Sequence, residues 1–425
     1  MKLGAAWRAL WETRSSLAGG LIVAAPREPV WTPRRYDRLA EEGYQKNLVA
    51  FAAINAVARA AASVPWLLYR RAGAARGEIE AHPLLTLLRR PNPLMGGGEF
   101  MEAVVANLLI AGNSYLEAVA PSAGPPREVW PLRPDRMRVL PDEQTGLPRA
   151  YVYAVGGRER RWPADPLTGR SAVLHLRTFH PLNDFYGLAP LEAAAQLIDL
   201  HNAANAWNMA LLQNSAAPSG ALVFAPKDGA TLTDAQRERL KADLAEGWTG
   251  ARRAGRPLVL EGGWEWKQIA LSPKDLDWQG IRQATARDIA LAFGVPPMLL
   301  GIPGDNTYSN LREARLAFWE DTVVPLLRRL RDDLNGWLAP QFAPEFELDL
   351  DLDEVPALTL RREAKFAMLE QANFLTDNEK RRATGYGDRP DGDHLPPARA
   401  KPKRLPSGPL VPGAGEGRPA EGDTQ

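Results

Sequence analysis

The chain has 425 residues, of which 45% are hydrophobic and 24% are charged, which is enough for about two or three domains with hydrophobic cores. It contains no cysteine, so disulfides and thiolate metal sites are excluded. Its formal net charge of +1 lacks the basic surplus of proteins that bind nucleic acid tightly through phosphates, although a local basic patch remains compatible with it.

The N-terminal residues 1–26 are expected to form a flexible amphipathic arm. Their apolar run, 17–25, contains two glycines and follows Glu12 and Arg14, which disfavours a signal peptide. No apolar run in the chain approaches the length of about 18 residues that a membrane-spanning helix needs. We therefore expect no membrane segment.

Residues 27–188 are predicted to form one α+β domain. Its expected elements are a helix over 36–62, a strand over 64–71, a short helix ended by prolines, a helix that breaks at Gly112-Asn113 and continues as a strand, and several short strands up to residue 179. Turn residues recur about every eight to twelve positions over 127–157, which is typical of short antiparallel strands.

Two long helices then bracket a small insert. Residues 189–215 read as an alanine-rich helix, and 271–300 contain a second one with Ser272 at its N-cap. Between them, 216–270 are predicted to form a small α/β unit of two strands and one helix. On the second long helix, Gln279, Gln283 and Arg287 recur every four residues and form a polar stripe.

The C-terminal third begins with a polar loop over 301–310. A helix predicted over 311–340 has cap spacing at Asn310 and Glu313, and Pro325 inside it predicts a kink. A strand is expected within 341–356, where 345–354 alternate between apolar and acidic residues. Two helices are expected over 357–394, the second capped by Thr376 and Glu379, and the Pro/Gly-rich 395–425 is expected to be disordered.

The sequence offers no convincing catalytic or metal site. It has no Walker loop, and the histidines lack metal-ligand spacing. His180 and Asp184 could be drawn as a base and its orienting carboxylate, but hydrogen bonds to the local backbone are the simpler interpretation. The acidic positions 349, 351 and 353 lack the glycine and glutamate of a calcium loop and read as the solvated face of a strand.

Several motifs together resemble the portal proteins of tailed bacteriophages, a family also found in gene transfer agents. The motifs are AGNSYLEAV, YGLAPLEAA, NSAAPSGAL, AFGVPPMLLG followed by TYSN, and LTDNEKRRATGYGD. Each is weak alone, but their order along residues 35–395 is specific.

The resemblance implies a portal fold with named parts. These are a wing (27–188 and 341–356), a two-helix stem (189–215 and 271–300), a small α/β clip (216–270), a tunnel loop (301–310), a kinked tunnel helix (311–340) and a helical crown (357–394).

The resemblance also implies a role. A ring of about twelve copies would stand at one vertex of a virion capsid, assembled in the bacterial cytoplasm, without cofactor, metal or enzymatic activity. Double-stranded DNA would pass through its centre, and the major capsid protein, the terminase large subunit and a head–tail adaptor would be its partners.

Three sets of residues follow as candidate contacts. The first set would line the DNA channel at the tunnel loop: Asp305, Asn306, Thr307, Tyr308 and Ser309. The second would line the channel wall of the stem: Gln279, Gln283 and Arg287. The third is a basic run that is either solvated or a partner contact of the clip: Arg252, Arg253 and Arg256.

Two other classes of protein stay open from the sequence. One is a different capsid-associated component, such as an adaptor or minor head protein, although adaptors are usually shorter and lack paired helices around an insert. The other is a hydrolase that uses His180 and Asp184, which lacks an evident third catalytic partner.

Overall fold

The computed structural model describes most of the chain between residues 31 and 395. The described residues are 31–72, 75–122, 124–142, 146–213, 220–224, 233, 264–268, 278–304 and 307–395. They belong to two compact units, unit 1 up to Leu358 and unit 2 from Thr359 onward. The predicted arm (1–26), most of the predicted insert and nearly all of the predicted tail lie outside the described residues.

Unit 1 begins with two helical pieces where the sequence predicted one. The pieces are α2 (Tyr36–Leu39), which runs into a π-helical turn (Ala40–Gln45), and α3 (Leu48–Ala62). The break comes at Asn47, whose side-chain oxygen accepts hydrogen bonds from the N–H groups of Val49 and Ala50 and so caps α3. The prediction of one continuous helix over 36–62 is wrong because this cap starts a new helix.

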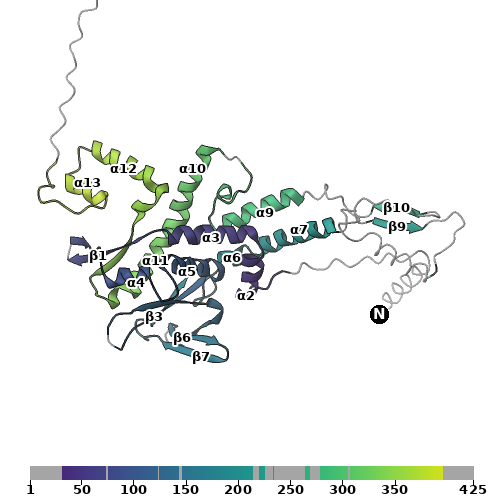
Figure 1. Cartoon of the computed structure of the whole chain (residues 1–425), viewed down its shortest axis with the longest axis horizontal. Helices are drawn as coiled ribbons and strands as arrows, with labels where there is room; N and C mark the ends of the chain where they lie inside the picture. The colour runs from purple at the N-terminus through teal and green to yellow at the C-terminus, as the bar shows by residue number, and fades with distance from the viewer. Residues whose placement is uncertain are drawn as a thin grey trace, which may run out of the picture. The chain divides into compact units, whose positions relative to one another are not determined.

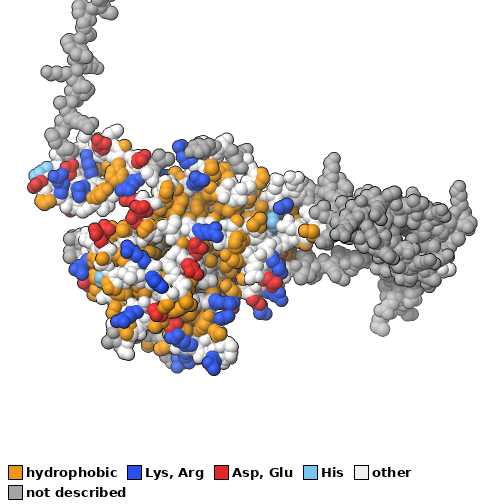
Figure 2. All heavy atoms as spheres, in the orientation of Figure 1, with side chains coloured by type: hydrophobic (Ala, Val, Ile, Leu, Met, Phe, Trp, Pro, Cys, Tyr) orange, Lys and Arg blue, Asp and Glu red, His pale blue; other side chains and the backbone are white. Residues whose placement is uncertain are grey.

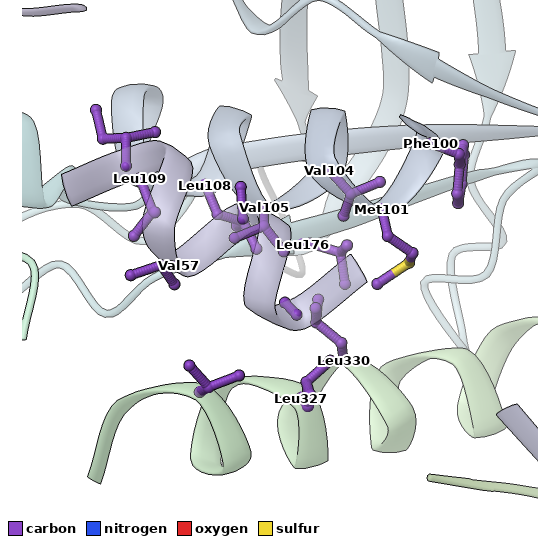
Figure 3. Close-up of a cluster of buried hydrophobic side chains, with 14 of the residues drawn as sticks. Val57, Phe100, Met101, Val104, Val105, Leu108, Leu109, Leu176, Leu327 and Leu330 are labelled. Carbon is purple, nitrogen blue, oxygen red and sulfur yellow. The ribbon is translucent and has the colours of Figure 1, made fainter. Parts of the chain in front are cut away.

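The main hydrophobic core of unit 1 lies between three helices. They are α3, α5 (Gly97–Ala111) and α11 (Val324–Trp337). Figure 3 shows Val57 of α3, Leu108 of α5 and Leu327 of α11 pointing into one cluster, and all three side chains are buried. Burying a side chain of this size contributes about 1.5–3 kcal/mol, so this cluster holds the three helices together.

The described strands form four antiparallel sheets. In sequence order they are β1 (Trp66–Ala72), β2 (Ala75–Glu78), β3 (Asn113–Val119), β4 (Glu128–Leu132), β5 (Met137–Pro141), β6 (Pro148–Val155), β7 (Arg158–Pro163), β8 (Val173–Arg177), β9 (Gly220–Phe224), β10 (Trp264–Gln268) and β11 (Phe346–Leu350). The strand orders are β11-β1-β2, β4-β3-β8, β5-β6-β7 and β10-β9. Together with the helices they confirm a mixed α+β fold (Figure 1).

The predicted break between α5 and β3 is present. Gly112 adopts a left-handed conformation with φ of 68°, and its N–H bonds the carbonyl of Leu108 to end the helix. A Cβ at Gly112 would lie 2.5 Å from the carbonyl oxygen of Gly187. Glycine is therefore required here both by the backbone angle and by the close approach of the segment before the long helices.

The last strand of unit 1 is shorter than predicted. β11 ends at Leu350, and the side chain of Asp351 accepts a hydrogen bond from the N–H of Asp353 and starts a short turn. Asp349 is also not simply solvated, since Arg76 and Arg331 donate to it at 2.6 and 3.1 Å. Burial raises the pKa of Asp349, but these hydrogen bonds outweigh burial and hold it below its usual range.

The remaining helices complete the two units. Unit 1 has α4 (Pro83–Arg89), α6 (Pro190–Ala193), α7 (Ala195–Gln213), α9 (Trp278–Ala292) and α10 (Tyr308–Ala317), with short 3-10 turns at Pro134–Arg136, Pro297–Leu300, Ala339–Gln341, Leu352–Glu354 and Pro356–Leu358. Unit 2 has α12 (Thr359–Gln371) and α13 (Asp377–Ala383). The predicted capping box of Thr376 and Glu379 is confirmed at the start of α13.

Candidate functional site

The candidate site is built on a pair of helices that run outward and back. α7 leads out to β9, and β10 leads back to α9; the two helices pack against each other (Figure 1). β9 and β10 form an antiparallel pair in which Gly220 faces Gln268 and Phe224 faces Trp264. The predicted long helix over 189–215 is interrupted at Ala194, between α6 and α7.

Polar side chains fasten the first turns of α7 to the start of unit 1. Asp199 accepts hydrogen bonds from the N–H and the hydroxyl of Thr32 at 2.7 and 2.5 Å. The side-chain amide of Asn202 donates to the backbone carbonyl of Glu42 at 2.9 Å and its oxygen accepts from Asn47 at 3.0 Å. Hydrogen bonds are directional, so these contacts fix the rotation of α7 about its own axis.

His201 lies buried within the same contact. Its Nδ1 is 3.2 Å from the side-chain nitrogens of both Asn47 and Asn205. The oxygen of Asn47 already caps α3, so its nitrogen faces the ring and Nδ1 must accept. Burial, together with the charge of Arg282, lowers the pKa of His201 and favours this neutral form.

A second polar cluster holds the segment that enters α6. The side-chain oxygen of Asn113 accepts from Gly187 N–H and from His175 Nε2, both at 2.9 Å. The hydroxyl of Thr178 donates to the carbonyls of Gly112 and Leu188 at 3.0 and 2.7 Å. Burial lowers the pKa of His175 to about 3, with a smaller effect from Arg177, so its ring stays neutral at ordinary pH. These buried polar residues were missed by the sequence analysis, which followed apolar periodicity.

The predicted polar stripe of α9 is largely accessible in a single subunit. Gln279 and Arg287 are exposed, and Gln283 is partly exposed. Arg287 does more than face solvent, because its guanidinium donates to the backbone carbonyl of Pro303. It therefore attaches α9 to the start of the polar loop, beside a hollow of about 390 Å³ that Gly304 and Glu313 also line.

The predicted loop over 301–310 is shorter than expected. Thr307 is the N-cap of α10, since its hydroxyl accepts from the N–H of Asn310, and Tyr308 and Ser309 lie in the first turn of that helix. The cap predicted at Asn310 is therefore three residues late. Asp305 and Asn306 lie outside the described residues, as do Arg252, Arg253 and Arg256.

The long helix after the loop is interrupted, although not by a simple proline kink. Residues 318–323 form a π-helical turn between α10 and α11, and Pro325 falls in the first turn of α11. Proline has no backbone N–H to donate to a helical carbonyl. Because Pro325 follows the π turn and lies in the first turn of α11, the helix accommodates it there. The hydroxyl of Thr322 in this turn donates to the carbonyl of Gly294, which links the turn to the end of α9.

The alternative catalytic pair is engaged in local structure. The Nδ1 atom of His180 accepts from the N–H of Leu182 at 3.0 Å, and the backbone carbonyl of Asp184 accepts from Arg177. Among the described residues there is no cluster of three or more side chains suited to a metal ion, and no helix is long and apolar enough to cross a bilayer.

Comparison with known proteins identifies the family to which this fold and its helix pair belong. Residues 48–385 match the family model described as phage portal protein. The chain therefore belongs to the phage portal protein family, as the sequence motifs predicted.

Relatives of known sequence agree with this assignment. An uncharacterized protein of Rickettsia bellii is 43% identical over 359 residues, which cover 84% of this chain and 91% of that protein. The portal protein of Enterobacteria phage HK97 is 27% identical over 321 residues, covering 74% and 72% of the two chains.

Solved structures agree as well. A chain from the neck of an empty gene transfer agent particle, computed with C6 symmetry, has a TM-score of 0.65 and 44% identity and covers 87% of this chain and 98% of its own. An HK97-family portal protein from Corynebacterium diphtheriae has a TM-score of 0.52 over 77% of this chain at 18% identity, a likeness of fold alone.

Proposed function

We propose that the protein is the portal subunit of a phage-like particle, either a phage or a gene transfer agent. Copies would form a ring at one capsid vertex, and double-stranded DNA would enter and leave through its centre. The match over residues 48–385, combined with the helix pair α7–α9 around β9 and β10, is the observation that carries this proposal. A similar chain comes from a gene transfer agent neck computed with C12 symmetry, which supports a ring of twelve.

The predicted parts keep their proposed roles with revised bounds. The wing would comprise the elements from α2 to β8 together with β11, and the stem would be α7 and α9 with β9–β10 in the clip at its tip. The tunnel loop would lie between Gly301 and Thr307, and α10 with α11 would be the tunnel helix. Unit 2 would be the crown. The clip would meet the terminase large subunit and later the head–tail adaptor, and the wing would contact the major capsid protein.

The near-neutral net charge of the protein is compatible with a channel through which DNA slides. A net charge of +1 gives no general attraction for phosphates, and on the face of unit 1 drawn in Figure 2 the basic and acidic side chains are interspersed. A channel wall of similarly mixed charge would hold sliding DNA weakly. Asp305, Asn306, Thr307, Tyr308 and Ser309 of the loop and Gln279, Gln283 and Arg287 of the stem would face the DNA. Arg287 is the single cation of this set, and its guanidinium already donates to the carbonyl of Pro303.

Electron microscopy of the purified protein tests the proposal. We expect negatively stained particles to be rings with an axial hole. A protein that stays monomeric at every concentration, or that forms compact particles without a hole, would contradict the portal role.

Single parts of the proposal have their own tests in a packaging assay. Alanine at Asn306 and Tyr308 should leave rings intact and reduce the amount of DNA packaged; unchanged packaging would remove the proposed loop contact. Charge reversal at Arg252, Arg253 and Arg256 should weaken terminase or adaptor docking to intact rings, and unchanged docking would leave that run simply solvated.

A further inference from the structure

The loop between β8 and α6, residues 178–188, exposes two large apolar side chains. Phe179 is 82% exposed and Leu182, three residues further along the loop, is 91% exposed. Scattered exposed apolar residues are common in soluble proteins, so exposure alone does not identify a contact surface. The unusual feature is that the backbone around these two residues is held at many points.

Hydrogen bonds fix this loop from within. The N–H of Leu182 donates to the His180 ring at 3.0 Å, and the side-chain oxygen of Asn183 accepts from the N–H groups of Phe185 and Tyr186 at 2.9 and 3.0 Å. Asx turns of this kind hold the backbone in one conformation.

Contacts with the rest of unit 1 fix the two ends of the loop. Thr178 bonds the carbonyls of Gly112 and Leu188, and the hydroxyl of Tyr186 accepts from the N–H of Val139 on β5 at 3.0 Å. A rigid segment loses little conformational entropy on binding, so its two apolar side chains are pre-organised for a partner.

An open hollow on α4 offers a fitting surface elsewhere on unit 1. Its volume is about 530 Å³, within the usual range of about 300–1,000 Å³ for ligand pockets. Pro83 and Leu87 supply apolar walls, with Thr86 beside them, and the guanidinium groups of Arg90 and Arg127 flank it.

The charges of the two surfaces are opposite. Arg90 and Arg127 are exposed, and neither side chain makes an ion pair within the described residues. On the loop, the carboxylate of Asp184 is likewise exposed and without an ion pair in the described part of the chain. Opposite charges at the rim of an apolar contact orient two partners and disfavour wrong ones.

We propose that the 178–188 loop of one copy inserts Phe179 and Leu182 into the α4 hollow of a second copy, with Asp184 facing Arg90 and Arg127. A ring needs a head-to-tail contact between two different surfaces of the same chain. In Figure 1, α4 lies apart from α6, which directly follows the loop, so one copy can offer both surfaces at once. This inference rests on the proposed ring, and names the surfaces that join its subunits.

Cross-linking tests the contact directly, because the chain has no cysteine of its own. In a Leu182→Cys, Thr86→Cys double variant, a short bismaleimide should join neighbouring copies into a ladder of covalent oligomers on a denaturing gel. Each single-cysteine variant should give no ladder. Leu167→Cys with Thr86→Cys is the matched control, since Leu167 is 90% exposed but lies on a different loop.

A second variant removes the apolar contact without disturbing the core. Phe179→Ser with Leu182→Ser should fold like the parent by circular dichroism and form rings only at concentrations at least tenfold higher. Asp184→Arg should weaken assembly in the same way, and Arg90→Asp in the same chain should restore it.

The outcomes separate this contact from the portal role itself. Rings in the microscope without a cross-linked ladder, or rings of the serine variant at the parent's concentration, would overturn the proposed contact and leave the portal role standing. Absence of rings from the parent protein would instead contradict the portal role.

Discussion

The two helices of the stem pair, α7 and α9, are attached to the rest of unit 1 by different balances of polar and apolar contact. α7 buries Ile198 and Ala204 and is held in addition by hydrogen bonds, from Thr32 to Asp199 and between Asn47 and His201. α9 is held mainly by apolar packing, with Ile289 and Ala290 buried in the helix and Phe293 buried directly after it. The directional hydrogen bonds fix the rotation of α7 about its own axis. Apolar packing is non-directional, so the position of α9 depends chiefly on how well its side chains fit the surrounding core.

The difference gives the two helices different mechanical roles. α9 continues into the loop that is proposed to touch DNA, and α7 connects to the wing. We infer that α7 is the more firmly fixed member of the pair. Its own side chains bond to the start of unit 1, whereas the hydrogen bonds of the α9 region, from Arg287 to Pro303 and from Thr322 to Gly294, lie at its C-terminal end.

The largest expected loss of stability comes from truncating a buried apolar side chain of α9. Ile289 is fully buried, so Ile289→Ala should lower the free energy of unfolding by about 2–5 kcal/mol, measured by denaturant titration. Leu291→Ala is the control on the same helix, because Leu291 is 75% exposed and should cost far less. Equal losses in the two variants would show that α9 is not held by this packing.

A somewhat smaller loss is expected at the end of α9. Gly294 has φ of 66°, and a Cβ there would lie 2.5 Å from the Thr322 hydroxyl, so Gly294→Ala should cost about 1–3 kcal/mol. Gly301→Ala is the matched control, since Gly301 has φ of 72° but no atom within 4 Å of its added Cβ. If both variants lose the same stability, the contact with Thr322 has no part in the attachment.

On the polar side, Asp199→Ala should cost about 1 kcal/mol. It removes the acceptor of two hydrogen bonds from Thr32, and a typical bond contributes about 0.5–1.5 kcal/mol. Arg34→Ala is the comparison at the same junction, because Arg34 is 3.9 Å from Glu192 and 64% exposed and such pairs contribute little. Denaturant titration should rank Asp199→Ala above Arg34→Ala, and the reverse order would contradict the assignment.

The smallest predicted effect is a dependence on pH. The pKa of His201 is lowered by burial, so below about pH 6.5 the unfolded chain takes up a proton that the folded chain resists. Stability should therefore fall as the pH drops through this range and be unaffected above it. In His201→Asn the side-chain oxygen replaces Nδ1 as acceptor without titrating, so thermal unfolding at pH 7.5 and 5.5 should differ less than in the parent. An equal acid loss in both proteins would contradict this role of His201.

Much of the fold could be predicted, and the errors have local physical causes. The break at Gly112 was visible because glycine and asparagine follow an apolar helix, and the capping box at Thr376 because both partners are local. The start of α10 was misplaced because Thr307 and Asn310 both have acceptable cap spacing, and only the folded backbone decides between them. At Asn47 the apolar periodicity continues across the break and hides it.

The candidate site was less predictable than the fold. Periodicity shows which side of α9 is apolar, but it does not show that Arg287 reaches the carbonyl of Pro303. The contacts of Asp199 and His201 join residues more than 150 positions apart, so no local sequence pattern predicts them. No local pattern marks Phe179 and Leu182 as exposed either.

The π-helical turn at 318–323 sets the rotational phase between α10 and α11. Such a turn contains one residue more than an α-helical turn would, and each residue of an α-helix advances by about 100°. Deleting the exposed Asp321 should let the two helices merge into one rod and swing Tyr308 and Ser309 about 100° around its axis, toward a different wall of the assembly. The deletion of one residue would thereby change the direction in which the residues nearest the loop face, without changing any of those residues.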